Sequence, residues 1–287
     1  MPKASSYIKF VSVVIFFMLL KRNLSHKSTV STLISARINN SLLLEKFPLN
    51  DLSDSYKIIS YIIDDNNFKR QQIGWKIGAT NEKAQQSLNT KEPFYGPLHR
   101  NYIFNNNEKI KLNGYGIFRA IEAEFCVKLK SDIVKKQSPY TPMEVYNLIE
   151  GIYPAIEIAA TRFKTSSLDI YNIISDFALN GCCVINTNHN LLQSTNDYNY
   201  LSNIPIVINI NNDKIVSSTG ASVLGNPIHA LTWLVNKLHE NQYILKKDDL
   251  IMTGACCLIN DINLIKNNDV IQIDFDGNKN VNMMAII

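Results

Sequence analysis

Residues 120–129 read Ala-Ile-Glu-Ala-Glu-Phe-Cys-Val-Lys-Leu, an alternation of apolar and polar side chains. Successive side chains of a β-strand point to opposite faces, so this pattern predicts a strand with one apolar face and one polar face. The apolar face comprises Ile121, Ala123, Phe125, Val127 and Leu129, and the polar face comprises Glu122, Glu124, Cys126 and Lys128. A strand of this kind belongs to a sheet that packs on a core.

The flanking sequence supplies further short strands and a few helices. Strands are expected at residues 72–79, 152–159, 250–253 and 270–275, and helices at 81–88, at 141–150 behind a Thr-Pro-Met-Glu capping box, and from 226 behind Asn-Pro. Prolines and a glycine at 93–97 predict a loop. Residues 31–63 have two amphipathic helical patterns separated by Pro48. The fold class is therefore α+β, with a strand-rich core and a helical N-terminal part.

The net charge and the cysteine count exclude some classes of function. The 287 residues carry a net charge of only +4, without a basic cluster studded with aromatic residues, so we expect no nucleic-acid partner. The five cysteines have neither zinc-site spacing nor an even count, which predicts reduced, buried thiols and a reducing compartment. A cytoplasmic location is the first expectation.

Residues 1–26 have a pattern that also allows a location other than the cytoplasm. An apolar run at 10–20 lies between lysines and Lys21-Arg22, and no acidic residue precedes Glu45. The run is short for a membrane helix but suits a signal or transit sequence. The segment is either a targeting or anchoring extension, to an organelle or a membrane, or a dispensable one.

Three glutamates and one lysine are the candidate chemical groups. Glu122 and Glu124 leave the same strand face about 7 Å apart, which allows a divalent ion to bridge them. Glu157 lies in a second apolar strand, and Lys76 lies between two glycines. Carboxylate oxygens suit Mg²⁺ or Mn²⁺ better than zinc. The alternative is a solvated strand face, which Lys128 on the same face supports.

Several motifs together resemble a known family. They are Gly-Trp-Lys-Ile-Gly-Ala-Thr at 74–80, Ile-Glu-Ala-Glu at 121–124, Ala-Ile-Glu-Ile at 155–158, and Val-Leu-Gly-Asn-Pro at 223–227 with the following helix to Leu238. The chain is similar to the 2-keto-4-pentenoate hydratase and 4-oxalocrotonate decarboxylase group of the fumarylacetoacetate hydrolase superfamily. The similarity extends from about Ser31 to Phe275.

The resemblance implies a fold, a cofactor and roles for residues. The fold would be a strand-rich mixed β roll, with residues 27–70 as a helical N-terminal part and 71–287 as the catalytic domain. Glu122, Glu124 and Glu157 would be metal ligands for Mg²⁺ or Mn²⁺, and Lys76 the catalytic lysine. Asp176, Asn180 and Gly254 would bind the substrate. A homo-oligomer is implied, and a paired decarboxylase or hydratase subunit is a further expected partner.

The implied activity is that of a lyase: metal-dependent hydration of a short 2-oxo acid or its dienol, of the 2-hydroxypenta-2,4-dienoate type. Three departures bear on this activity. Phe94 and Ala160 stand where the family has aspartates, and Leu179-Asn180 stands where it has two serines. The metal ligands are thus retained while polar groups near the substrate differ. Decarboxylation or another oxo-acid reaction, and a catalytically silent partner subunit, are the alternatives.

Overall fold

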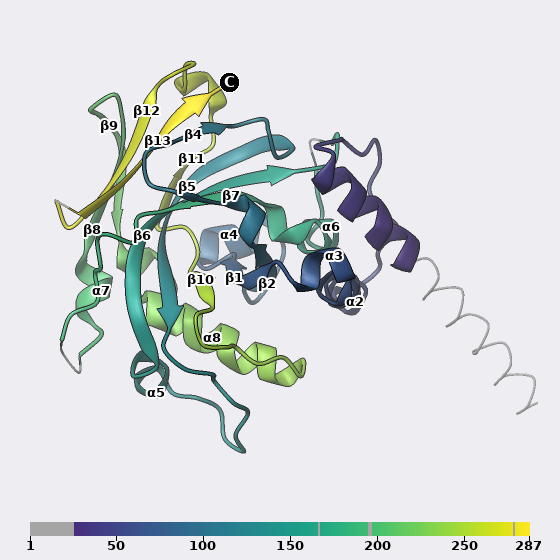
Figure 1. Ribbon diagram of the computed structural model, residues 1–287, viewed down its shortest axis with the longest axis horizontal. Coiled ribbons are helices and arrows are strands. Elements are labelled where there is room, and N and C mark those ends of the chain that lie inside the picture. The colour runs from purple at the N-terminus through teal and green to yellow at the C-terminus, as the bar shows by residue number, and fades with distance from the viewer. Residues whose placement is uncertain (1–25, 166, 195–196, 278) are drawn as a thin grey trace, which may run out of the picture.

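Two β-sheets and a group of helices make up the chain (Figure 1). The computed structural model describes residues 26–165, 167–194, 197–277 and 279–287. The helices are the segment 26–38, α2 (Leu52–Asp64), α3 (Asn66–Lys69), α4 (Glu82–Ser87), α5 (Pro142–Tyr146), α6 (Ile170–Ser175), α7 (Tyr200–Asn203) and α8 (Pro227–Glu240), with short 3₁₀ turns at Arg100–Tyr102, Phe177–Leu179, Gly220–Ser222 and Ile262–Leu264.

The larger sheet has eight strands in the order β2-β1-β10-β5-β6-β7-β3, and β11 also pairs with β5. Its strands are β1 (Gln72–Gly78), β2 (Phe94–His99), β3 (Ile103–Asn105), β5 (Ile117–Leu129), β6 (Ile149–Thr161), β7 (Asn180–Ile185), β10 (Leu250–Met252) and β11 (Cys257–Ile259). β1 with β10, and β3 with β7, pair in parallel, while the other pairs are antiparallel. The sheet is therefore mixed.

The smaller sheet covers the apolar face of β5. Its order is β4-β13-β12-β8-β9, formed by β4 (Glu108–Lys111), β8 (Pro205–Ile210), β9 (Asp213–Thr219), β12 (Val270–Phe275) and β13 (Lys279–Ile286). Phe125 of β5 meets Phe275 of β12 with their ring centroids 5.2 Å apart. The opposite face of β5 carries the glutamates and a second small apolar cluster that includes Cys126, Cys183 and Met252. Most of both faces of β5 is thus shielded from water, with Glu122 and Lys128 partly exposed.

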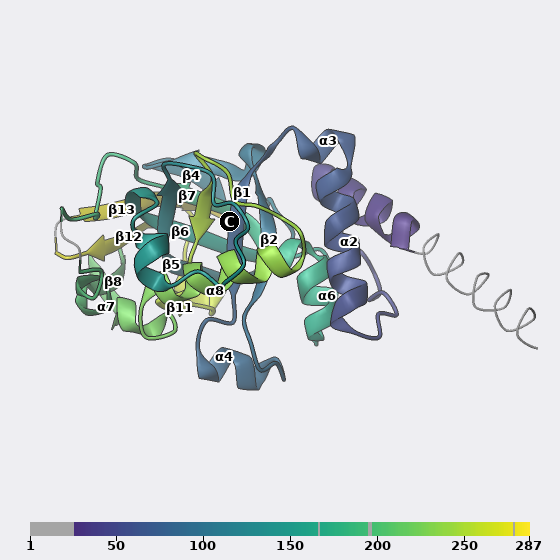
Figure 2. The same cartoon turned by 90° about the horizontal axis from the view of Figure 1, so that it is seen from below.

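The helical N-terminal part packs beside the larger sheet. Helices α2, α3 and α6 lie together at one end, away from the five-stranded sheet, in both Figure 1 and Figure 2. Leu33 of the first helix and Ile58 and Ile62 of α2 are fully buried in the same core cluster as Trp75 and Ile77 of β1. These helices therefore share the hydrophobic core that packs against the larger sheet. The predicted boundary at residue 70 stays a prediction.

Most of the expected elements are confirmed, and two expectations are wrong. The capping box of Thr141 and Glu144 is present, but α5 ends at Tyr146 rather than near Glu150. The predicted loop at 93–97 is strand β2, at the edge of the sheet. An edge strand tolerates Pro97, because one of its sides needs no backbone donor. All five cysteines are free, and four of them are buried.

The prediction for residues 1–26 falls almost entirely outside the described residues. Within the described part of the chain, no helix is long and apolar enough to cross a membrane.

Candidate metal centre and active site

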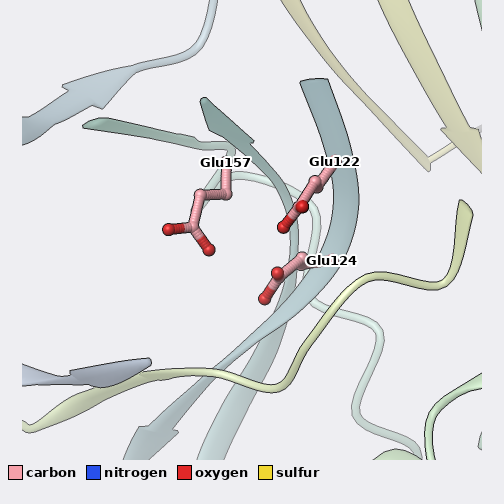
Figure 3. A group of neighbouring side chains, drawn as sticks. All are labelled: Glu122, Glu124 and Glu157. Carbon is pink, nitrogen blue, oxygen red and sulfur yellow. The ribbon is translucent and has the colours of Figure 1, made fainter. Parts of the chain in front are cut away.

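Three glutamates from two neighbouring strands converge on one point (Figure 3). Glu122 and Glu124 come from β5, and the strand register places Glu157 of β6 directly opposite Glu122. One carboxylate oxygen of each lies within 4.8 Å of those of the others. Glu124 and Glu157 are completely buried. The solvated-face alternative is therefore wrong for Glu124, whereas Glu122 is partly exposed.

Specific donors fix two of these carboxylates. The backbone N–H of Gly254 donates to Oε2 of Glu124 at 2.8 Å, and Nδ2 of Asn180 donates to Oε1 of Glu157 at 2.9 Å. Nζ of Lys76 lies 3.3 Å from Oε2 of Glu157 and donates to the carbonyl oxygen of Ala178 at 3.1 Å. The lysine and two of the glutamates are thus held in place before any ligand arrives.

The metal-free cluster is electrostatically unfavourable. Burial, and then the charge of Glu157, raises the pKa of Glu124 well above its ordinary value. Burial also raises the pKa of Glu122 to about 7, although Lys76 opposes the shift. For Lys76, burial alone would lower the pKa, but the carboxylates of Glu157, Glu122 and Glu124 outweigh it and raise the pKa, so the amine stays protonated. One ammonium therefore faces three acidic side chains.

The residues present fit a hard divalent cation. Oε1 of Glu124 is buried and has no hydrogen-bond partner among the described residues, and Oε2 of Glu157 has only the ammonium contact with Lys76. Buried oxygens without donors are costly unless a cation meets them. An all-oxygen set of three carboxylates matches the preferences of Mg²⁺ or Mn²⁺. Glu122, Glu124 and Glu157 would hold such an ion.

Gly254 occupies a position that an L-residue would fill badly. Its φ is +103°, and an added Cβ would lie 2.2 Å from Oγ1 of Thr80. The close approach brings its N–H to Glu124. The predicted substrate-binding role of Gly254 stays a prediction, because the contact seen is with the carboxylate.

Asp176 and Asn180 are both fully buried beside this cluster. Asp176 accepts from the side-chain hydroxyl of Thr161 and from the backbone and guanidinium of Arg162, so both of its oxygens are engaged. Asn180 contacts Glu157 directly. Their role in substrate binding stays a prediction; the contacts seen are with Arg162 and Glu157.

The sequence pattern assigns no role to Arg37 or Arg162. Arg162 follows the Ala-Ile-Glu-Ile motif at 155–158 by four residues, and this position is the signal that could have identified it. It pairs with Asp176 and donates to the carbonyl oxygens of Tyr115 and Asn180. Arg37 gave no such signal, because a single arginine in an amphipathic helix is usually exposed.

Comparisons with known proteins show which sequences and folds this chain resembles. No family model matches the chain. The 2-keto-4-pentenoate hydratase of Paraburkholderia xenovorans (strain LB400) is 26% identical over 236 residues, which cover 82% of this chain and 84% of that protein. The 4-oxalocrotonate decarboxylase from Pseudomonas putida G7, solved in complex with magnesium and adipate, superposes with a TM-score of 0.80 at 20% identity, over 92% of this chain and 98% of that one.

A further solved structure has a similar fold. A fumarylacetoacetate hydrolase from psychrophilic Exiguobacterium antarcticum superposes with a TM-score of 0.51 at 14% identity, over 75% of each chain. The protein therefore has the mixed α+β fold of the fumarylacetoacetate hydrolase type. Within that class, its similarity to the 2-keto-4-pentenoate hydratase and 4-oxalocrotonate decarboxylase group is confirmed.

Proposed function

We propose that the protein is a divalent-metal-dependent, hydratase-like lyase acting on a short 2-oxo acid or its dienol. The observation that carries the proposal is the buried cluster of Glu122, Glu124 and Glu157 facing protonated Lys76. The similarity to 2-keto-4-pentenoate hydratases over most of both chains supports the reaction class. We propose Mg²⁺ or Mn²⁺ as the cofactor, because the ligand atoms are all carboxylate oxygens.

The chain's own groups suit an anionic substrate. A bound divalent ion would supply Lewis-acid polarisation of the substrate's carboxylate and keto oxygens. Lys76 is buried and charged, so its ammonium binds a carboxylate or stabilises negative charge that develops on an adjacent oxygen. Asn180 and Gly254 keep Glu157 and Glu124 in position during turnover. Excluding water strengthens each of these interactions.

Substrate choice depends on the positions that differ from the family pattern. Phe94 is buried, and its ring packs on Gly78, where an added Cβ would lie 2.4 Å from the ring. Ala160 is also fully buried, whereas Leu179 is partly exposed. Apolar groups at these three positions favour a substrate whose distal end is uncharged. We propose a dienol of the 2-hydroxypenta-2,4-dienoate type.

The assembly and location are part of the same proposal. We propose a homo-oligomer, as the family resemblance implies. The names of the relatives support a decarboxylase or hydratase as a further partner. The four buried thiols and one half-buried thiol support a reducing compartment such as the cytoplasm.

The test is turnover of 2-hydroxypenta-2,4-dienoate by the purified chain with Mg²⁺ or Mn²⁺, followed as loss of the dienol's ultraviolet absorbance. We expect metal-dependent formation of 4-hydroxy-2-oxopentanoate, identified by mass, and its loss in EDTA. Glu157→Gln is the matched variant, because it keeps the side-chain volume while removing one charge. Turnover that survives both EDTA and this substitution would contradict the proposal.

Decarboxylation is the second candidate, because the decarboxylase from Pseudomonas putida G7 superposes over nearly the whole chain. A 2-oxo acid with a second carboxylate, such as 4-oxalocrotonate, distinguishes the two reactions. Release of CO₂ from that substrate, with no hydration of the dienol, would replace the leading proposal.

A further inference from the structure

Arg37 connects the N-terminal helix to the carboxylate cluster. It lies in the last turn of the helix 26–38, yet its side chain is only 5% exposed. Its guanidinium donates through Nη1 to the carbonyl oxygen of Asn180 and through Nη2 to Oδ1 of Asn180 at 3.0 Å. Burial, and then the charge of Arg162, lowers the pKa of Arg37 to about 10, so the group stays charged at neutral pH.

This contact determines how Asn180 faces Glu157. An amide side chain has one accepting oxygen and one donating nitrogen, whereas a guanidinium can only donate. Because Arg37 engages Oδ1, the nitrogen of Asn180 must point to the other side, where it donates to Glu157. Without Arg37, the amide is free to rotate and place its oxygen against the carboxylate, which would repel it.

The segment just before Asn180 is conformationally unfavourable. Phe177, Ala178 and Leu179 have φ values of 54°, 53° and 61°, which places three consecutive non-glycine residues in the left-handed region. Each costs about 1–2 kcal/mol relative to the right-handed conformation. The carbonyl oxygen of Ala178, in the middle of this left-handed turn, is the one that accepts from Lys76.

Arg37 contacts both ends of the left-handed turn. Its guanidinium carbon lies 4.4 Å from the ring centroid of Phe177 and 3.9 Å from that of Tyr102, while its nitrogens bind Asn180. Arg162 contacts the residue just before the turn, donating to the carbonyl oxygen of Asp176 at 2.7 Å. The two arginines thus hold a conformation that the local sequence alone does not favour.

We propose that Arg37 is a positioning residue of the active site: by orienting Asn180 and holding the turn at Phe177–Leu179, it fixes Glu157 and Lys76 for the metal and the substrate. The ion and the 2-oxo acid in this statement rest on the proposed function. A purely structural Arg37 would only anchor the first helix to the roll. It would then affect the free energy of unfolding without affecting metal affinity.

The test compares Arg37→Ala, Arg37→Lys and Lys27→Ala in the full chain. Lys27 is an exposed cation on the same helix, so Lys27→Ala is the matched control. The first readout is Mn²⁺ affinity, measured by electron paramagnetic resonance of free and bound ion, with thermal unfolding as a check on folding. For Arg37→Ala we expect affinity to fall by up to about ten- to a hundredfold, the range for loss of a hydrogen bond to a metal ligand, because Arg37 orients the Asn180 amide that donates to Glu157. Lys27→Ala should not change it.

Rescue separates positioning from general destabilisation. Methylguanidinium should enter the space left in Arg37→Ala and restore part of the Mn²⁺ affinity, whereas tetramethylammonium at the same ionic strength should not. Arg37→Lys keeps the charge but lacks the planar guanidinium whose two nitrogens donate to the two Asn180 oxygens, so we expect an intermediate loss of affinity. This variant also serves if the alanine variant does not fold.

A double-mutant cycle with Asn180→Ala completes the test. Because Arg37 acts through Asn180, the double variant should lose no more affinity than Asn180→Ala alone. A folded Arg37→Ala or Arg37→Lys protein with wild-type Mn²⁺ affinity would overturn the inference. Since these readouts need no turnover, they stand even if the wild-type protein fails on every dienol, a result that would refute only the proposed function.

Discussion

At the residue scale, Glu122 makes the stability of the metal-free protein fall as pH rises from acid to neutral. The pKa of Glu122 is raised from 4.5 to about 7, chiefly by burial. A carboxyl with a raised folded-state pKa gives its full stability below its unfolded pKa, and this contribution is lost as pH rises through the folded pKa. In EDTA, wild-type stability to urea should therefore fall between about pH 5 and pH 8 through this group.

Glu122→Gln should remove that component, because a glutamine at this position does not ionise. The measurement is the difference in the free energy of unfolding between variant and wild type, taken at several pH values in EDTA. The difference should favour the variant increasingly as pH rises. Adding Mn²⁺ should reverse the order, since the wild type retains the third ligand. A difference that does not vary with pH would contradict the prediction.

His99 predicts sensitivity in the acid direction. It is fully buried, and neither ring nitrogen has a hydrogen-bond partner among the described residues. Burial, and then the charge of Arg37, lowers its pKa well below 6.5. The unfolded chain takes up a proton below about pH 6.5 while the folded chain does not, so stability is lost as pH falls, by at most about 1.4 kcal/mol per pH unit.

His99→Leu checks this prediction. The ring of His99 lies against Phe68, with centroids 4.5 Å apart, so an apolar side chain of similar size suits the site. We expect the variant to lose less stability than the wild type between about pH 7 and about pH 5, the range around the unperturbed histidine pKa. An equal slope in His99→Leu and the wild type would exclude a neutral buried imidazole.

At the scale of elements, the turn after β10 determines how Glu124 is held. Gly254→Ala places a methyl group against Thr80 at a φ of +103° and displaces the N–H that binds Glu124. We expect a loss of more than about 1 kcal/mol of stability from the backbone alone, together with about tenfold weaker Mn²⁺ binding. Thermal unfolding and a Mn²⁺ titration measure the two effects.

Thr80→Ala in the Gly254→Ala background separates the clash from the conformation. Removing the hydroxyl and methyl of Thr80 removes the contacts at 2.2 and 2.6 Å but leaves the Thr80 Cβ at 2.9 Å and the positive φ. Stability should recover partly, and metal affinity less. Full recovery of both would show that the contact with Thr80, rather than the backbone geometry, determines the position of Glu124.

The sequence could predict elements whose pattern is local. β5 was predictable because its alternation is encoded in adjacent residues, and α5 because its capping box spans four residues. β2 was not, because Pro93, Gly96 and Pro97 indicate a loop and only pairing with β1 makes residues 94–99 an edge strand. The left-handed turn at Phe177–Leu179 was not predictable either, since contacts from Arg37 and Arg162 impose it.

Some features of the candidate site could likewise be predicted from the sequence, and others could not. Glu122, Glu124, Glu157 and Lys76 could be grouped because family-like motifs surround them, and the structure brings them together. The direct cross-strand position of Glu122 and Glu157 could not be read from the sequence, because register depends on both strands. Arg37 is separated from Asn180 by 143 residues, and no pattern connects them.

At the scale of the whole molecule, a bound ion should stabilise the entire fold. The proposed ligands come from the central strands β5 and β6. The first helix, the eight-stranded sheet and the five-stranded sheet share one continuous hydrophobic core. The site is therefore lost only when this core unfolds. An ion that binds only the folded chain adds about 2.7 kcal/mol at a hundredfold excess over its dissociation constant. The melting temperature should therefore rise with Mg²⁺ or Mn²⁺ and return to its initial value in EDTA.

Glu124→Gln links this stabilisation to the carboxylate cluster. Its amide oxygen can still accept from Gly254, so the local hydrogen bond is kept in a side chain that cannot ionise. The metal-free variant should melt at a temperature equal to or above that of the metal-free wild type, because burial and Glu157 make the ionised form of Glu124 unfavourable and glutamine has no such form. Its melting temperature should respond to Mn²⁺ only at concentrations at least about a hundredfold higher, since a direct ligand matters more than a supporting contact. A wild-type response in this variant would place the ion elsewhere, and with it the chemistry that we assign to Lys76.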